Sequence, residues 1–333
     1  IHTCDLSFSF YSRDLISYKG WNLGNPFSPR KNLFSKKSYQ LFMEIIRFNN
    51  LGKNIVLLGT YKELFGDFLK KNAFTALFIE GYLYPLMTIL WSCPFDNLYE
   101  LPTDFVLMYL KQNGLLETLG SPTWYFLRGG ALAYTEPLTQ DFRQNIHLNT
   151  PVIKILRDKY HITLQTQHQA YTFDTLILAT QADQALKLLQ NPSPLERHLL
   201  SSFKYVTRNV YLHTDKTVMP PQKQYWAALN YINKDKQLLT YHANRVQKFV
   251  SKMDYFITMH EGKPIIPGKI VIKTTLNRPQ YTAQNIANQA RFNEINGILN
   301  TYYCGSYWGH GTLEDAVKSV YRALLPLQTV ESL

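Results

Sequence analysis

The sequence has few of the residues and motifs that mark several large protein classes. Only three cysteines, Cys4, Cys93 and Cys304, occur in 333 residues, and such an odd, widely spaced set argues against a disulfide framework. A reducing compartment, the cytoplasm, is therefore expected. The chain contains no GxSxG, GxxxxGK[ST], CxxC or HExxH motif. It thus lacks the signatures of α/β-hydrolases, P-loop proteins, thioredoxin-like redox proteins and zinc proteases.

Acidic residues are in the minority. The chain has 24 Asp and Glu against 35 Lys and Arg, a formal net charge of +11. The basic residues are scattered through runs such as PRKNLFSKK, KELFGDFLKK and HANRVQKFVSK. This spread favours a broad attraction to anionic surfaces, including peripheral contact with an anionic membrane, over a module that recognises nucleic acid. A solvated basic surface without a partner is the alternative.

A long unbroken apolar run is also missing. Residues 73–94 (AFTALFIEGYLYPLMTILWSCP) come closest to a transmembrane segment, but Glu80, Gly81 and Pro85 interrupt them at mid-span. An acidic residue inside a bilayer is costly, and proline removes a backbone donor. We therefore expect a buried, kinked helix here.

What the sequence does contain is enough apolar material for a large core. Hydrophobic residues make up 45% and aromatic residues 14% of the chain, which is long enough for two domains. Apolar residues recur with helical spacing in 36–50, 61–80 and 101–118, the last with Pro102 at its start and Gly114 near its end. The first third is therefore expected to be mainly helical.

The periodicity changes after Asn149. The segments PVIKILRD, HITLQTQ and AYTFDTLILAT read as three strands, and Leu176–Ala179 is apolar on both faces, as in a strand buried in a parallel sheet. A helix is expected over Asp183–Leu189. Aromatic-rich strands follow within 203–275, and a further helix is expected over 283–297.

The last part, TYYCGSYWGHGTLEDAVKSVYRAL at 301–324, combines a strand, a glycine-spaced loop and a helix start. Gly305, Gly309 and Gly311 would let the backbone approach a ligand closely. Thr312 and Asp315 form an [ST]-x-x-[DE] cap, so the N–H groups of the first helical turn would face the loop. Such a start can hold an anionic cofactor, although a simple cap has the same pattern.

Nine segments together carry a family resemblance. In order, they are DLSFSF, RKNLF with a helix ending in IIRFNN, YLYPLMTILWSCP, WYFLRGGALAY, NTPVIKILRD, FDTLILATQADQALKLL, NPSPLERHLLSSF, ANRVQ and YYCGSYWGHGTLEDAVKSV. The chain resembles, nearly end to end, the predicted FAD/NAD-binding oxidoreductases related to flavin-containing amine oxidases. That superfamily shares its fold with phytoene- and squalene-type desaturases.

The resemblance implies a mixed α/β fold, with a Rossmann-like FAD domain interleaved with a helical and antiparallel-sheet substrate domain. Residues 1–145 and 193–298 would form the helical and the sheet parts of the substrate domain. Residues 146–192 and 299–333 would form the FAD domain. Relatives begin with a strand–GxGxxG–helix unit that binds the FAD pyrophosphate. The sequence starts at Ile1 without such a unit, so we expect it to be the remainder of a chain that began earlier.

The resemblance also implies a set of residues around FAD. Val152 matches a position whose backbone meets the adenine, although an ordinary strand valine is an equal interpretation. Ala179 and Thr180 end a strand beside the crevice, Gly305 and Ser306 lie beside the ribityl chain, and Gly309 belongs to the same loop. Gly311, Leu313 and Glu314 would face the flavin N1/O2 edge, where reduced flavin gathers negative charge.

Further residues match or neighbour positions on the substrate side: Trp91, Gly130, Tyr231, Tyr241, Asn244, Trp308 and His310. Ordinary core packing is the alternative for each aromatic residue. His161 and His168 have no spacing that defines a metal site, so no metal is expected. The resemblance implies an oxidoreductase that removes hydride from a C–N or C–C bond of a lipid-like substrate, with no nucleophile required. The alternative is a non-catalytic remnant or partner subunit.

Overall fold

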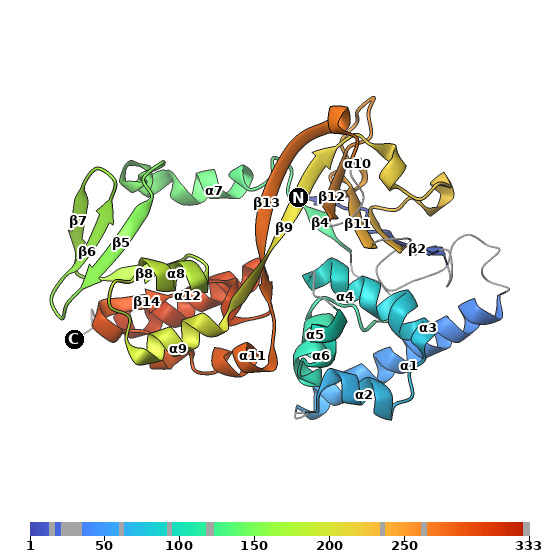
Figure 1. The fold of residues 1–333 in the computed structure, drawn as a ribbon, viewed down its shortest axis with the longest axis horizontal. Helices are drawn as coiled ribbons and strands as arrows, with labels where there is room; N and C mark the ends of the chain where they lie inside the picture. The colour runs from blue at the N-terminus through green and yellow to red at the C-terminus, as the bar shows by residue number, and fades with distance from the viewer. Residues whose placement is uncertain are drawn as a thin grey trace. The chain divides into compact units, whose positions relative to one another are not determined.

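The chain forms two compact units, which are described separately (Figure 1). The computed structural model describes residues 1–12, 17–20, 35–59, 63–91, 95–117, 123–233, 237–260 and 265–328. Unit 1 contains Ile1–Gln140 and Thr207–Arg278, and unit 2 contains Asp141–Val206 and Pro279–Leu333. The block expected over 193–298 is therefore divided between the two units, because its first and last residues pack with unit 2. Cys93 and the RKNLF segment lie outside the described residues.

Unit 1 contains a seven-stranded sheet in the order β13-β9-β12-β11-β10-β2-β3. Its strands are β2 (Phe8–Ser12), β3 (Tyr18–Gly20), β9 (Lys204–His213), β10 (Leu229–Asn233), β11 (Gln237–His242), β12 (Phe256–His260) and β13 (Ile270–Gln280). β2 and β10 pair in parallel, whereas β10, β11, β12 and β9 pair as an antiparallel series. A small antiparallel pair joins β1 (His2–Thr3) to β4 (Tyr125–Phe126). The strands expected within 203–275 are thus confirmed.

The two faces of this sheet differ in chemistry. On one face the rings of Phe10 and Tyr231 stack with centroids 6.0 Å apart, and Tyr84 packs edge-on against Tyr231. On the other face a buried polar row crosses three strands: His213 Nε2 contacts Thr258 Oγ1 at 2.8 Å, and Thr258 Oγ1 contacts Thr240 Oγ1 at 2.8 Å. Side chains alternate between faces along a strand, so one sheet carries both an aromatic and a polar surface.

The helices of unit 1 build an aromatic core. They are α1 (Lys36–Leu58), α2 (Phe65–Lys71), α3 (Ala76–Phe78), α4 (Tyr84–Trp91), α5 (Phe95–Tyr99), α6 (Thr103–Gln112), α7 (Leu132–Thr139) and α10 (Ala243–Val246). α1 buries Leu41, Ile45 and Phe48 along one face, as its period requires. The helix expected over 61–80 is interrupted after α2, where Ala73 has a positive φ of 47°. α6 ends before Gly114, which takes a φ of 67°.

The kink expected within 73–94 is a π-helical turn, Ile79–Leu83, between α3 and α4. Pro85 has no N–H to donate to the Gly81 carbonyl four residues earlier. That carbonyl instead accepts a hydrogen bond of 2.9 Å from the buried Tyr18 hydroxyl. None of the helices in the described ranges combines the length and the apolar character needed to cross a membrane.

Unit 2 contains a three-stranded antiparallel sheet, a parallel strand pair and four α-helices among its described residues. The strands are β5 (Val152–Arg157), β6 (Ile162–Thr166), β7 (Ala170–Phe173), β8 (Leu176–Leu178) and β14 (Thr301–Tyr303); the helices are α8 (Ala182–Leu188), α9 (Pro194–Ser202), α11 (Ala283–Gln289) and α12 (Leu313–Gln328). β5, β6 and β7 pair in that order, and β14 pairs with β8 in parallel. Residues from both segments of the unit form one apolar core.

Three expectations in this unit need correction. AYTFDTLILAT contains two strands, β7 and β8, that belong to different sheets. Ile177, in the middle of β8, is 42% exposed, so this strand is not buried on both faces as described. The helix expected over 283–297 ends at Gln289, and Gly297 and Leu299 then adopt positive φ values of 94° and 48°. These turns bring the chain into β14.

Candidate functional site

The parallel strands β8 and β14 end at the same edge of unit 2. Leu178 lies opposite Tyr303, and the Cys304 N–H donates to the Leu178 carbonyl at 3.0 Å. Ala179 and Thr180 follow β8 and are exposed, and Gly305 follows Cys304. Ligands of open α/β sheets bind outside the carboxyl ends of the strands. The structure thus brings together two groups of residues that lie more than a hundred positions apart in the sequence.

The loop after β14 is held by hydrogen bonds to its own backbone and to one carboxylate. The Ser306 carbonyl accepts from the N–H groups of Gly309 and Gly311 at 3.1 and 3.2 Å. Asp315 Oδ2 accepts from the N–H groups of His310 and Thr312, both at 3.0 Å. The Thr312 hydroxyl in turn accepts from the Asp315 N–H at 3.1 Å, which confirms the predicted cap. The loop is therefore pre-organised.

Neighbouring side chains explain the three glycines of this loop. A Cβ at Gly309 would lie 2.4 Å from Asp315 Oδ1, and one at Gly305 would lie 2.6 Å from the Tyr307 ring. Gly311 has a φ of 89°, and a Cβ there would lie 2.6 Å from the Tyr281 hydroxyl oxygen. Glycine is therefore required at these three positions so that the loop can pack against neighbouring side chains of the protein. An additional role in letting a ligand approach stays a prediction.

The first turn of α12 keeps two backbone donors available. The Thr312 carbonyl accepts from the Ala316 N–H at 3.2 Å, so the helical hydrogen bonds begin there. Across the described residues, the N–H groups of Leu313 and Glu314 donate to no protein atom, and the Leu313 side chain is 66% exposed. These N–H groups lie at the positive end of the helix dipole. A role for these two N–H groups in binding an anion stays a prediction.

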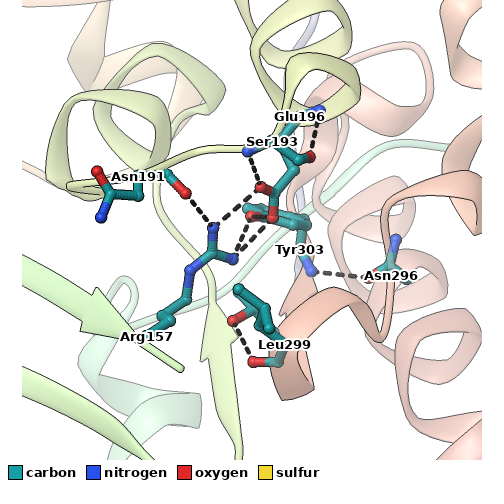
Figure 2. Close-up of polar contacts among 8 residues, drawn as sticks. Arg157, Asn191, Ser193, Glu196, Asn296, Leu299 and Tyr303 are labelled. Atoms are coloured by element: carbon teal, nitrogen blue, oxygen red, sulfur yellow. Dashed lines mark hydrogen bonds and ion pairs between the residues drawn. The ribbon is translucent and has the colours of Figure 1, made fainter. Parts of the chain in front are cut away.

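A polar cluster includes Tyr303 of β14, as Figure 2 shows, and the side chains of Arg157 and Glu196 in this cluster are buried. The Arg157 guanidinium at the end of β5 contacts both carboxylate oxygens of Glu196 in α9, at 2.7 and 2.9 Å. The Tyr303 hydroxyl donates to Glu196 Oε1 at 2.5 Å, and the Ser193 N–H donates to Oε2 at 2.7 Å. The cluster joins β5, α9 and β14 and so positions the strand that leads into the loop.

The ionisation of this cluster follows from its contacts. Burial opposes ionisation of Glu196, but hydrogen bonds from Arg157, Tyr303 and the Ser193 N–H outweigh that effect and lower the pKa of its carboxyl. Burial and the adjacent Glu196 carboxylate raise the pKa of the Tyr303 hydroxyl. This cluster was not predicted from the sequence, and the Ser193-x-x-Glu196 pattern of a capping box is the signal that could have located Glu196. The partners from β5 and β14 had no sequence signal.

The other residues of unit 2 that were predicted to line the ligand site pack in its core or hold the loop before α12. Val152 opens β5 and packs against the core of the unit. Trp308 is buried, with its ring edge-on to Phe203 and Phe292 at 5.3 and 4.9 Å. His310 is half-buried and gives its backbone N–H to Asp315. The contacts of these residues with a ligand stay predictions.

Two aromatic residues predicted for the substrate side of unit 1 lie in its core. Trp91 packs on Phe105 and Tyr109, with ring centroids 5.5 and 4.5 Å away. Tyr231 is 1% exposed and lies between Phe10 and Tyr84. Tyr231 therefore belongs to the aromatic face of the sheet, and Trp91 belongs to the helical core.

Tyr241 lies on the same sheet face as Tyr231, since it pairs with Leu229 across the β10–β11 ladder. Burial raises the pKa of its hydroxyl, and the positive charge of Arg278 partly opposes the rise. The Asn244 side chain instead forms two hydrogen bonds with the backbone. Its side-chain nitrogen donates to the Met253 carbonyl at 3.0 Å, and its oxygen accepts from the Tyr255 N–H at 2.7 Å. Asn244 therefore fixes the turn that precedes β12.

Gly130 lines a cavity of about 810 Å³ in unit 1. Three segments form its walls, residues 2–3, 126–130 and 247–250. Gly129 and Gly130 have positive φ values of 91° and 67°, and a Cβ on Gly130 would meet no atom within 4 Å. Among the predicted substrate-side residues, Gly130 is the one that lines this cavity. Residues 2–3 and 247–250 were not predicted to line a cavity, although 247–250 belong to the basic run HANRVQKFVSK.

The model of the flavin containing amine oxidoreductase family matches residues 64–290 of the chain. The match includes the first strands and helices of unit 2 and most of unit 1. The chain belongs to this family. FAD is the family's cofactor, and its members are oxidoreductases. No curated protein matches the chain significantly.

Solved structures of several enzymes share the fold. A CLA-producing fatty acid isomerase from P. acnes superposes with a TM-score of 0.63 at 16% identity, covering 98% of this chain and 80% of its own. Cyclohexylamine oxidase from Brevibacterium oxydans gives 0.64 at 10% identity, covering 98% and 82%. Putrescine oxidase bound to putrescine gives 0.62 at 7% identity, also covering 98% and 82%. Identities this low establish the fold alone.

The residues of this amine-oxidoreductase chain fit one edge of a flavin. The open N–H groups of Leu313 and Glu314 suit an electronegative ring edge, and Ala179 and Thr180 are exposed at the adjacent strand end. Asp315 does not compete for these two donors, because its carboxylate is engaged by His310 and Thr312. The donor set at the start of α12 is therefore compatible with FAD.

Proposed function

We propose that this chain is an FAD-dependent oxidoreductase that takes hydride from a C–N or C–C bond of a lipid-like substrate. The family membership supports the redox chemistry and the cofactor. The observation that carries the assignment to particular residues is the open start of α12 beside the carboxyl ends of β8 and β14. Such a start offers fixed donors where negative charge would develop.

FAD and the residues of the chain would have separate roles in the reaction. FAD, when bound, supplies the hydride acceptor. The N–H groups of Leu313 and Glu314 would hold its N1/O2 edge, and Gly305 and Ser306 would lie along its ribityl chain. The buried rings of Phe203 and Phe292 pack against Trp308, support the loop and exclude water from it. No side chain has to act as a nucleophile in this scheme.

A test of the flavin site removes one donor and keeps the helix. Proline is favoured at the first position of a helix because its missing N–H is not used there. Leu313→Pro should therefore leave α12 intact and weaken FAD binding about ten- to a hundredfold, since a charge-assisted hydrogen bond contributes about 1.5–3 kcal/mol. Flavin fluorescence titration measures the affinity. Leu313→Ala is the matched control and should bind like the unsubstituted chain.

Equal FAD affinity of the Pro and Ala variants would move the flavin away from this helix start. No saturable binding of FAD by the unsubstituted chain would contradict the proposed function itself. The two results are distinguishable because the first leaves binding intact.

The lipid-like substrate is supported by the apolar side of the large sheet that carries Tyr241. Tyr241 is half-buried, whereas Phe10 and Tyr231 on the same face are buried in the core, so Tyr241 is the residue of these three that could contact an aliphatic chain. Anaerobic mixing of the FAD-loaded protein with an unsaturated fatty acid, a polyprenol and a short diamine tests this proposal. Bleaching of the flavin absorbance should be faster with a long-chain compound than with the diamine. Faster bleaching by the diamine would overturn the substrate class.

We further propose that the protein works in the cytoplasm, with reversible contact at the inner face of the membrane. Cys4 and Cys304 are free thiols in the structure, which suits a reducing compartment. The net charge of +11 favours approach to an anionic lipid surface.

A further inference from the structure

A loop of unit 1 presents apolar side chains to solvent. The 247–253 loop runs from the end of α10 toward β12 and contains Phe249, Val250 and Met253. Val250 is 102% exposed, Met253 is 48% exposed and Phe249 is 38% exposed. Single exposed apolar residues are common, but three within five positions at one loop form a patch.

Hydrogen bonds keep this loop from folding its apolar residues inward. The Asn244 amide group ties down Met253 and Tyr255, as described above, and the Met253 N–H donates to Ser251 Oγ at 3.1 Å. Lys248 adopts a φ of 47°, which is strained for a residue with a Cβ, and its Nζ donates to Thr3 Oγ1 at 2.9 Å. The loop is therefore braced in an outward-facing conformation.

The surroundings of the loop are basic. His2, Arg128 and Lys248 line the adjacent 810 Å³ cavity, and its lining includes no aspartate or glutamate. Over the described ranges, Arg128, Lys248 and Lys252 form no ion pair with a carboxylate. The surface thus combines apolar residues with uncompensated positive charge.

Two acidic residues close in sequence to the cavity walls, Asp5 and Asp254, are already paired. Asp5 lies 3.5 Å from Arg245, and Asp254 lies 2.7 Å from Lys216 and 3.2 Å from His242. These contacts reduce the negative charge that would otherwise oppose an anionic partner.

We propose that the 247–253 loop docks the protein on an anionic lipid bilayer, and that the adjacent basic cavity receives an anionic lipid headgroup. Apolar side chains flanked by lysines match the boundary between acyl chains and headgroups of such a bilayer. The inference does not depend on the redox chemistry, since it rests on the loop and the cavity of unit 1. It assigns the proposed membrane contact to one segment.

Vesicle co-sedimentation with the full chain tests the proposal. Binding should be strong to vesicles of phosphatidylcholine with phosphatidylglycerol, and weak to phosphatidylcholine alone. Val250→Asp should weaken it by about tenfold, because it removes apolar contact and adds a repelled charge. Leu58→Asp is the matched control, since Leu58 is 80% exposed at the end of a helix elsewhere in the same unit and should have no effect.

The electrostatic part has its own pair of variants. Lys252→Gln should weaken binding by about fivefold, the effect expected for one basic residue near an anionic surface. Lys70→Gln, at an exposed lysine of α2, should change it much less. Equal losses in the two variants would show that only the overall charge of the protein matters, which would overturn the loop assignment.

Insertion can be observed directly with Phe249→Trp. On addition of anionic vesicles, the fluorescence attributable to residue 249 should shift to the blue and be quenched by brominated acyl chains. A Phe249→Tyr variant supplies the signal of the native tryptophans for subtraction. Binding to vesicles without this shift, or loop-dependent binding to a protein partner with none to vesicles, would overturn the proposal.

Discussion

At the scale of single residues, the most strongly constrained group is the ion pair of Arg157 and Glu196. Their side chains are 2% and 0% exposed, and Tyr303 and Ser193 supply the remaining hydrogen bonds. A buried pair of this kind is expensive to break, because the remaining charge loses its partner inside the protein. The cluster links three elements of unit 2, so its integrity decides how β14 leads into the loop before α12.

We predict that Glu196→Gln lowers the free energy of unfolding by about 3–5 kcal/mol in urea denaturation at pH 7. The lowered pKa of Glu196 stabilises the fold above its ordinary value of 4.5, and this contribution is lost as pH falls through the folded-state value. The pH dependence below 4.5 should therefore be shallower in the variant. Glu294→Gln breaks an exposed pair with Arg291 and is the control, with no measurable effect. Similar losses for both variants would contradict the assignment.

At the scale of elements, the polar row across β9, β12 and β11 gives the large sheet a fixed register. The Asp215 N–H donates to His213 Nδ1 at 3.1 Å, so the imidazole carries its proton on Nε2 and donates it to Thr258. Thr258 Oγ1 also shares a hydrogen bond with Thr240 Oγ1, in which either hydroxyl can be the donor. Burial lowers the pKa of His213 to about 4, with the Asp215 charge partly opposing that shift. A neutral histidine is therefore part of the fold.

The lowered pKa of His213 makes the folded state less stable as the pH falls. An unfolded histidine binds a proton near pH 6.5, whereas the folded His213 does so near pH 4, so stability is full above 6.5 and falls between these values. The loss should be about 3 kcal/mol, from about 1.4 kcal/mol per pKa unit. Urea unfolding at a series of pH values measures it. His213→Gln should remove this step, whereas His161→Gln, at an exposed position, should retain it. A step that persists in His213→Gln would assign it to another group.

At the scale of the whole molecule, the chain is basic and rich in apolar residues. None of its described helices could span a membrane. Glu80 is an exposed residue of the π-helical turn, and Pro85 is buried in the core of unit 1. The segment that looks most apolar in the sequence is thus used for packing within a unit. The attraction to lipid that we propose is assigned to surface charge and exposed loops.

Cell fractionation should therefore find membrane-associated protein that a high-salt wash releases, because salt screens surface charges beyond about 3–10 Å. The Val250→Asp variant should shift further into the supernatant even at low salt, and Leu58→Asp should behave like the unsubstituted chain. Protein that survives both high salt and alkaline carbonate, and leaves only with detergent, would show integral insertion.

The sequence by itself determined the features that depend on neighbouring residues. Helical periodicity located α1 and α6, aromatic-rich segments located the strands of the large sheet within 203–275, and Thr312 and Asp315 marked the start of α12. Ordered motifs along the chain also identified the family before any contact was known. These signals are local or linear, so they survive without knowledge of the fold.

Only the tertiary structure decided which distant residues meet. Arg157, Glu196 and Tyr303 come from three elements separated by 39 and 107 positions, and their individual letters carry no sign of the cluster they form. The same holds for Gly311, whose need for glycine comes from the Tyr281 hydroxyl, and for the cavity beside the 247–253 loop. The physical reason is that burial and electrostatic pairing are properties of positions in space, which separate stretches of sequence reach only when the chain folds.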